Sequence, residues 1–296
     1  MNAKTNLSLV GLAAAVLLVT PSVGSAGILA SEGFDYNTGA LTGNSGGAGW
    51  AGAWTAPGSV VRADVVDTTA NPLSFTQSGG APIDGGTRAL EVALTGSQSS
   101  QLCGVRTLAT PLAETFYAGY LVRYAGSGSW AGANNTFTLH LGTNSTSTTT
   151  LNFGLRGGAA NEFVIRYGTG APVSGASTGG DLVNGTTYYL VARVNWDGSA
   201  FTSANMWLNP SLSDDVDTPT GDASLTLATP FANPITHIFF REAVLDADDV
   251  LQADEIKIGT AWSDVLPVPE PSSMALLMLG VAGILALRRQ GISGRG

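Results

Sequence analysis

Apolar and polar residues alternate with a period of two along most of the chain. Within residues 115–124 every second position from Phe116 onward is apolar or aromatic, and within 136–141 Phe137, Leu139 and Leu141 alternate with polar neighbours. Successive side chains of a strand point to opposite faces, so this pattern predicts half-buried strands. The same pattern predicts further strands at Ser59–Val66, Thr87–Leu94, Leu102–Leu108, Leu151–Arg156, Glu162–Tyr167, Thr187–Trp196, Ala204–Leu208, Ile235–Arg241 and Ala253–Ile258.

Helical periodicity over twelve or more residues is absent from this central region, and Gly, Ser, Asn or Pro separate its strands. About a dozen short strands in one unit predict an all-β fold, an antiparallel two-sheet β-sandwich spanning residues 27–266. Asp197 and Gly198 predict the hairpin turn between the strands at 187–196 and 204–208.

The N-terminus combines Lys4, an apolar run over residues 7–19, a break at Pro21 and small residues up to Ala26. This order is typical of a secretory signal peptide, which predicts export by the Sec machinery and cleavage after Ala26. An uncleaved membrane anchor is the alternative, although the run is short for a membrane span. Residues 1–26 are therefore assigned to the signal.

A second apolar run occupies residues 272–287 near the C-terminus and is followed at once by Arg288 and Arg289. As a helix it would extend about 24 Å, which is short but sufficient for a transmembrane helix. The paired arginines predict that the far end stays at the cytoplasmic face, so the central region lies outside. A plain tail anchor is one interpretation of this segment.

The whole segment 267–296 resembles the PEP-CTERM sorting signal of Gram-negative bacteria. Pro269, Glu270 and Pro271 match the motif, residues 272–287 match its transmembrane helix, and Arg288 with Arg289 match its basic stop. The resemblance implies recognition by an exosortase, transient anchoring in the inner membrane, removal of the tail, and delivery to the cell surface or extracellular matrix.

Short motifs in the central region resemble LamG-like, concanavalin A-like jelly-roll domains. They are Glu32–Tyr36, Gly46–Trp54, Tyr188–Trp196, Met206–Pro210 and Asp254–Val265. The resemblance implies a jelly roll over most of residues 28–266. Proteins of this fold range from carbohydrate binders to glycosidases and adhesion modules, so the fold alone does not select a function.

The charge balance limits the partners. Nine basic and 21 acidic residues lie between Gly27 and Leu266, a net charge near −12, and no basic patch is visible. Phosphate binding needs clustered positive charge, so nucleic acid is excluded as an expected partner. Cys103 is the single cysteine, so an intramolecular disulfide is impossible, and it is expected to be a buried apolar residue.

The sequence contains only weak indications of catalytic residues. Glycoside hydrolysis requires two carboxylates that face each other, whereas Asp254 and Glu255 are adjacent and should point to opposite faces of a strand; Glu91, Glu114 and Glu162 have no partner at strand spacing. Residues 43–47 and 175–179 match the Gly-x-Ser-x-Gly pattern without a following helix. The two histidines are the remaining bases: we expect His140 on a solvent face and His237 between apolar residues.

Two acidic loops are candidate Ca²⁺ sites, because carboxylate oxygens are hard ligands. Each is equally consistent with a solvated acidic turn, and no other cofactor is expected. The loops contain Asp246, Asp248 and Asp249, and Asp214, Asp215 and Asp217.

Trp50, Trp54 and Trp130 lie in Gly-rich stretches where exposed indoles would stack on sugars. Buried packing at the edge of the sandwich is the favoured interpretation of the three.

These observations favour a non-enzymatic surface or extracellular-matrix protein that is sorted by an exosortase and binds a polysaccharide of the producing cell. The alternative is a secreted carbohydrate-active enzyme, a glycosidase or a lyase, on the same fold.

Overall fold

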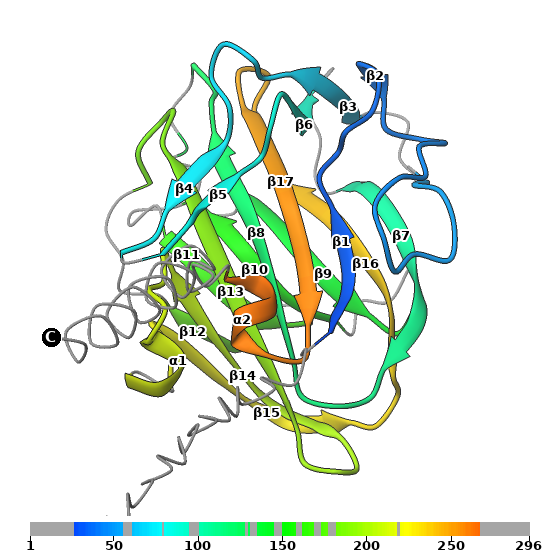
Figure 1. The fold of residues 1–296 in the computed structure, drawn as a ribbon, viewed down its shortest axis with the longest axis vertical. Helices are drawn as coiled ribbons and strands as arrows, with labels where there is room; N and C mark the ends of the chain where they lie inside the picture. The colour runs from blue at the N-terminus through cyan, green and yellow to red at the C-terminus, as the bar shows by residue number, and fades with distance from the viewer. Residues whose placement is uncertain are drawn as a thin grey trace, which may run out of the picture.

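Figure 1 shows the computed structural model of the chain. The structure describes residues 27–55, 61–78, 80–94, 101–127, 130, 135–144, 150–157, 162–168, 173–176, 182–217 and 220–266. Strands dominate this part of the chain, which confirms the all-β prediction and the two-sheet β-sandwich.

The larger sheet has the strand order β15-β14-β13-β8-β17-β6-β3-β2, with β1 paired to β17. All of its described pairs are antiparallel. Its strands are β1 (Ile28–Glu32), β2 (Gly39–Ala40), β3 (Val61–Asp67), β6 (Arg88–Leu94), β8 (Phe116–Tyr124), β13 (Thr187–Trp196), β14 (Phe201–Leu208), β15 (Ala223–Phe231) and β17 (Val250–Gly259).

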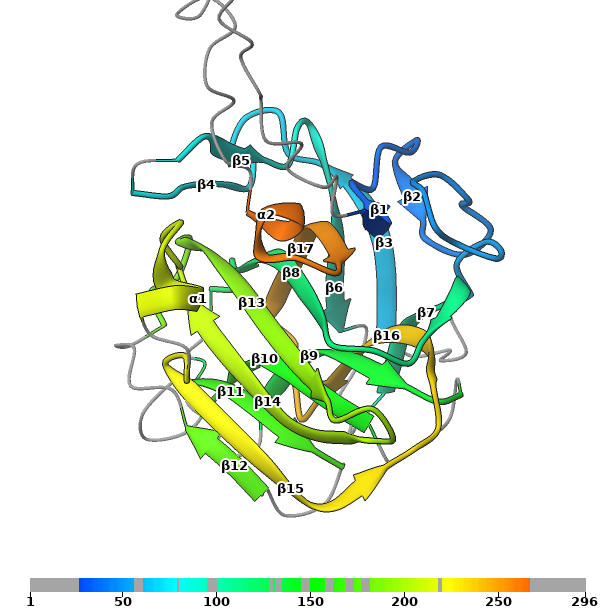
Figure 2. The same ribbon diagram turned by 60° about the horizontal axis from the view of Figure 1, so that its bottom comes forward.

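The smaller sheet has the order β12-β11-β10-β9-β16-β7 and is also antiparallel in its described pairs. Its strands are β7 (Gln101–Leu112), β9 (Thr136–Gly142), β10 (Thr150–Arg156), β11 (Glu162–Tyr167), β12 (Val173–Ala176) and β16 (Ile235–Ala243). The sheets meet at one edge, where β12 lies beside β15 (Figure 2).

The core fills the space between the two sheets with alternate side chains of both. Tyr120 of β8 packs edge-on against Phe153 of β10 and Phe240 of β16, and its hydroxyl donates a hydrogen bond of 3.0 Å to the Phe153 carbonyl. The buried phenol thereby keeps a partner, as a polar group in an apolar core requires. Cys103 is buried in the same core, as predicted.

A second apolar cluster covers the opposite face of the larger sheet. The ribbon of β4 (Ser74–Thr76) and β5 (Pro82–Asp84) and the short helix α2 (Trp262–Val265) lie over Tyr189 and Trp207. A further short helix, α1, spans Asp214–Asp217.

The predicted hairpin between β13 and β14 is confirmed. Asp197 Oδ1 accepts hydrogen bonds from the backbone N–H groups of Ser199 and Ala200, at 2.8 and 2.9 Å, and Gly198 adopts φ +100°. The hydrogen bonds to its carboxylate lower the pKa of Asp197.

Several strands lie outside the predicted segments, among them β1, β12 and β15. In β15 the apolar alternation is confined to Ala223, Leu225 and Leu227, after which Pro230 and exposed positions follow. Such an edge strand buries too few residues to produce a clear periodic signal.

Candidate functional site

One face of the smaller sheet carries a group of polar side chains. Across the strands His140 of β9 lies opposite Asn152 of β10 and Phe239 of β16, and Asn152 lies opposite Arg166 of β11. Directly opposed residues share a face, and Arg241 joins the group because it pairs with Thr138. The neighbouring positions of these strands point into the core, so this group, which we call the polar face, is directed away from the sandwich interior.

Hydrogen bonds hold His140 in one orientation. Its Nδ1 lies 2.7 Å from Thr150 Oγ1, its Nε2 lies 2.9 Å from Thr138 Oγ1, and its ring stacks on Phe239 with centroids 4.8 Å apart. Burial, with smaller contributions from Arg241 and Arg166, holds the pKa of His140 well below 6.5. The ring is therefore neutral at neutral pH, with one nitrogen donating and the other accepting a hydrogen bond.

Asn152 lies between His140 and Arg166 in the sheet and holds the arginine. Its Nδ2 donates a hydrogen bond of 3.2 Å to the Gly168 carbonyl, and its Oδ1 accepts one of 3.1 Å from Arg166 Nε. Burial, followed by the charges of Arg156 and Arg241, lowers the pKa of Arg166 to about 10. Arg166 remains a cation at neutral pH, held by its amide neighbour.

The two half-buried arginines of the polar face are not ion-paired. Within the part of the chain that the structure describes, neither Arg166 nor Arg241 forms an ion pair. Burial lowers the pKa of Arg241, and the nearby charge of Glu242 opposes this shift. Glu242 follows Arg241 along β16, but its position opposite Phe137 places it on the interior face of the sheet. Cations that are partly removed from water without a counter-ion favour the binding of an anion.

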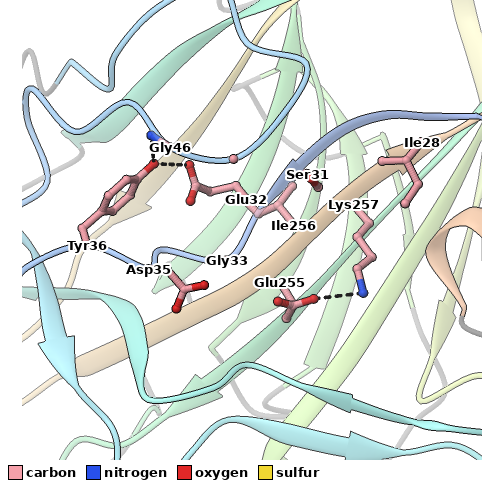
Figure 3. A pocket seen from close by; sticks show the side chains of 11 residues that line it. Ile28, Ser31, Glu32, Gly33, Asp35, Tyr36, Gly46, Glu255, Ile256 and Lys257 are labelled. Carbon is pink, nitrogen blue, oxygen red and sulfur yellow. Dashed lines mark hydrogen bonds and ion pairs between the residues drawn. The ribbon is translucent and has the colours of Figure 1, made fainter.

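A second polar cluster lies where β1 meets the loop that follows it. Figure 3 shows Tyr36 donating its hydroxyl hydrogen bond of 2.6 Å to Glu32 and accepting one of 2.9 Å from the Gly46 N–H. Arg106 of β7 forms an ion pair with Glu32, and both side chains are 1% exposed. Burial, together with the bond to Glu32, raises the pKa of Tyr36 to about 12.

These contacts satisfy Glu32 completely. Its Oε1 accepts the Phe34 N–H at 2.7 Å, and its Oε2 accepts from Trp54 Nε1 at 3.0 Å as well as from Tyr36 and Arg106. Arg106 also donates to the carbonyls of Gly46 and Gly52 and lies over the ring of Trp50. The cluster joins the two sheets and is structural.

A cavity of about 320 Å³ lies beside this cluster, and Asp35 and Glu255 line it (Figure 3). Lys257, which pairs with Glu255 at 2.9 Å, lies on its wall. The cavity is acidic, in contrast to the polar face.

Two of the three tryptophans considered for sugar stacking are buried. Trp54 is 0% and Trp130 is 3% exposed, so both rings pack in the core, in agreement with the favoured interpretation, and neither can stack on a sugar as they lie here. Trp50 is half-buried: its ring packs beside Trp54, Arg106 lies over it, and its Nε1 donates to the Ser31 carbonyl at 2.9 Å. Sugar stacking on Trp50 stays a prediction.

The predicted Ca²⁺ loops have protein partners for some of their carboxylates. Asp249 is buried and accepts hydrogen bonds from the Tyr124 hydroxyl and the Asp246 N–H, at 2.9 and 2.8 Å, and burial raises its pKa. Asp215 pairs with Arg193 at 2.7 Å, and Asp214 accepts from Ser211. Cation binding at Asp246, Asp248 and Asp249, or at Asp214, Asp215 and Asp217, stays a prediction.

Both terminal signals lie outside the described residues. This holds for cleavage at Ala26, for the motif Pro269, Glu270 and Pro271, and for the basic stop Arg288 and Arg289. Among the helices that the structure describes, none has the length and apolar character needed to cross a bilayer.

The expectation that His140 faces solvent is wrong, because its residue is 1% exposed. The alternation correctly predicts that His140 points away from the core, which Phe137, Leu139 and Leu141 enter. The face of the sheet that carries His140 is buried as well. Sequence reasoning also missed Asn152, Arg166 and Arg241. The sequence shows only that these three residues occupy polar positions of predicted strands. It does not show which of those strands are neighbours in the sheet.

The C-terminal resemblance is confirmed by a match to the PEP-CTERM protein-sorting motif over residues 267–290. This motif marks the chain as an exported exosortase substrate, sorted at the membrane toward the cell surface of a Gram-negative bacterium. No curated protein matches the sequence.

The fold is similar to several solved structures of carbohydrate-active proteins. An endo-β-1,4-glucuronan lyase from the fungus Trichoderma reesei has 12% identity and a TM-score of 0.43, covering 80% of this chain and 97% of that one. A variant of alginate lyase Aly36B, in complex with an alginate tetrasaccharide, has 15% identity and a TM-score of 0.42, covering 79% and 96%. A carbohydrate esterase from Shiga toxin-encoding bacteriophage phi24B has 16% identity and a TM-score of 0.42, covering 79% and 99%.

These similarities concern the fold, a jelly-roll β-sandwich consistent with the concanavalin A-like prediction. They also correct the expectation that the protein is not an enzyme, because two lyases and an esterase are among the structures that it resembles. That expectation rests on the sequence pattern alone, in which no two carboxylates are paired at strand spacing.

Proposed function

We propose that this exported protein binds an acidic polysaccharide on the polar face of its smaller sheet. The observation that carries the proposal is the pair of half-buried arginines, Arg166 and Arg241, which lack a carboxylate partner among the described residues. A guanidinium group pairs well with the planar carboxylate of a uronic acid residue.

The polar face extends across several strands. The row from Arg166 through Asn152 and His140 to Phe239 crosses four adjacent strands, a width of about 14 Å. Asn152, His140 and Phe239 are 0–1% exposed, so the half-buried Arg166 and Arg241 are the members of the polar face that would contact the polymer. The rest of the body is strongly acidic and repels polyanions, so binding depends on these few cations rather than on general charge.

The site of action follows from the sorting motif. Export and exosortase processing deliver the body to the outside of the cell. We propose that it resides in the extracellular matrix and that its ligand is a uronate-containing exopolysaccharide of the producing cell.

Replacing Arg166 or Arg241 with glutamine is expected to weaken binding of a soluble polyuronate such as alginate by about ten- to hundredfold. Each change removes a charge-assisted hydrogen bond of roughly 1.5–3 kcal/mol. The measurement is isothermal titration calorimetry on the mature protein. Arg88→Gln is the control, because Arg88 is an arginine of the other sheet that already pairs with Asp67. Equal affinity for a neutral glucan, or equal losses in all three variants, would contradict the proposal.

The neutral His140 beside two cations favours a second function at the same face, cleavage of the bound polymer by β-elimination. Arg166 or Arg241 would neutralise the uronate carboxylate, which acidifies the adjacent C5–H bond. A base removes that proton, the C–H electrons form the C4=C5 double bond, and the C4–O bond breaks as the leaving oxygen gains a proton. His140 is 1% exposed and both ring nitrogens contact threonine hydroxyls, so to act as this base it must become accessible and exchange one hydroxyl for the substrate.

His140→Gln is therefore expected to lower the cleavage rate by at least about a hundredfold and to leave polyuronate affinity within about threefold. The measurement is the ultraviolet absorbance of the conjugated double bond that forms at each cut. Because the pKa of His140 lies well below 6.5, the wild-type rate should be independent of histidine protonation at pH 6.5 and above and should fall only in more acidic solution. Cleavage by the variant at the wild-type rate would exclude His140 as the base.

A further inference from the structure

His237, the second of the two histidines in the chain, lies on β16 beside the polar face. It pairs with Gly142 of β9, while Phe239, two positions further on, pairs with His140. Alternate residues of a strand share a face, so His237, Phe239 and Arg241 point to the same side of the smaller sheet. The residues between them enter the core. His237 therefore borders the polar face.

The accessibility of His237 differs from that of the other histidine. His140 is 1% exposed, and threonine hydroxyls contact both of its ring nitrogens. His237 is half-buried, and among the described residues its side chain has one hydrogen-bond contact, from Nδ1 to Thr236 Oγ1 at 2.7 Å. Its Nε2 is therefore the imidazole nitrogen that a ligand can reach without displacing a protein group.

A threonine hydroxyl determines which nitrogen of His237 carries the proton. Thr236 Oγ1 donates its one proton to the Thr143 carbonyl oxygen at 2.7 Å. Because a carbonyl oxygen only accepts, the same hydroxyl must accept from His237 Nδ1 if both contacts are to be satisfied. Burial lowers the pKa of His237, so the ring is neutral at neutral pH and its single N–H lies at Nδ1. Nε2 is left with a lone pair and is a hydrogen-bond acceptor.

His237 and the two arginines of the polar face are widely spaced. Arg241 lies four residues along β16 from His237, about 14 Å away. Arg166 lies three strands away on β11 and is offset by two residues from each of them, which gives roughly 16 Å to either. These three half-buried side chains surround the buried members of the polar face. A ligand that contacts all three must be an oligomer rather than a single sugar.

We propose that His237 Nε2 accepts a hydrogen bond from a hydroxyl group of the bound polysaccharide, which makes His237 a specificity-determining residue. This role rests on the proposed binding of an acidic polysaccharide at the polar face. The arginines pair with carboxylates, whereas an acceptor nitrogen requires a donor, and a sugar hydroxyl is the donor that a polyuronate provides. An O-acetylated sugar has lost that donor, so the site distinguishes free from acetylated hydroxyls.

The test measures the affinity of the mature protein for alginate and for O-acetylated alginate of the same length by isothermal titration calorimetry. The wild type should bind the acetylated polymer about three- to tenfold more weakly, which corresponds to one neutral hydrogen bond. His237→Asn keeps a donor near the Nδ1 position and has no group at the Nε2 position, so it should bind alginate at the weaker level and lose the discrimination. His237→Gln places an amide oxygen near the Nε2 position and should retain most of it.

Nitrogen-15 NMR of the imidazole rings gives a readout that is independent of affinity. The chain has two histidines, so His237→Asn identifies the signals of His237 by their loss. At neutral pH His237 should be the Nδ1–H tautomer, and added alginate should shift its Nε2 signal. Thr236→Val removes the acceptor for Nδ1–H, so it should mix the two tautomers and weaken alginate binding about threefold, as expected for a positioning residue.

Failure of this role and failure of the proposed function give different results. A wild type that does not bind alginate would overturn both. Alginate binding that requires Arg166 and Arg241 but is unchanged in His237→Asn would overturn the role of His237 alone. Equal affinity of the wild type for the two polymers, or an Nε2–H tautomer in the wild type, would do the same.

Discussion

Arg106→Ala is expected to lower the free energy of unfolding by about 3–5 kcal/mol, because it leaves the carboxylate of Glu32 buried without its counter-charge. The substitution also removes the donors that bind the carbonyls of Gly46 and Gly52, and the cation that lies over Trp50. In a body of this size the loss corresponds to a decrease in Tm of roughly 10 °C. Chemical denaturation and calorimetry would measure it.

Arg88→Ala provides the comparison. Arg88 also forms an ion pair, with Asp67 at 2.8 Å, but the two side chains are 28% and 56% exposed. Water screens such a pair, so the expected loss is much smaller than that for Arg106→Ala. Equal losses for the two variants would show that burial of the Arg106 pair contributes nothing, which would contradict the structural role given to it.

Gly49→Ala is expected to destabilise the body by about 3 kcal/mol or more. Gly49 has φ +80°, and a Cβ there would lie 1.9 Å from the Leu29 carbonyl oxygen and 2.7 Å from the Ala30 Cα. Strain at a positive φ and a clash with the backbone of β1 therefore add together. The Gly49 carbonyl also accepts the Ala109 N–H at 2.9 Å, which fixes the loop to β7.

Gly52→Ala is the matched control in the same loop. It is exposed, and a Cβ there would have no atom within 4 Å. Its stability should change by less than about 0.5 kcal/mol. Comparable losses at the two positions, measured by urea denaturation, would argue against close docking of this loop on β1.

Much of the sandwich follows from local pattern. The alternation around β8 and β9 and the turn at Asp197 and Gly198 each depend on a few adjacent residues, so a single sequence contains their signal. The edge strand β15 has a weak pattern because much of it is exposed. The period also predicts which side chains of β9 enter the core.

The candidate sites depend instead on which strands become neighbours. Arg166, His140 and Arg241 come from three strands that are joined only through the pairings of β9 with β10 and β16, and of β10 with β11. Glu32 and Arg106 are 74 residues apart. After Asp254 the regular alternation of the strand is interrupted by a β-bulge and by the left-handed backbone of Glu255. Glutamate has no sequence preference that would predict this conformation.

The position of β17 has a consequence for export. This strand, near the C-terminal end of the body, lies between β8 and β6 in the larger sheet and also pairs with β1, the first strand. While the chain emerges from N- to C-terminus, the larger sheet lacks its middle until residues 250–259 are outside. Folding that waits for such distant pairings is slow, so translocation can be completed on an unfolded chain, and the sandwich cannot close before residues 250–259 have emerged.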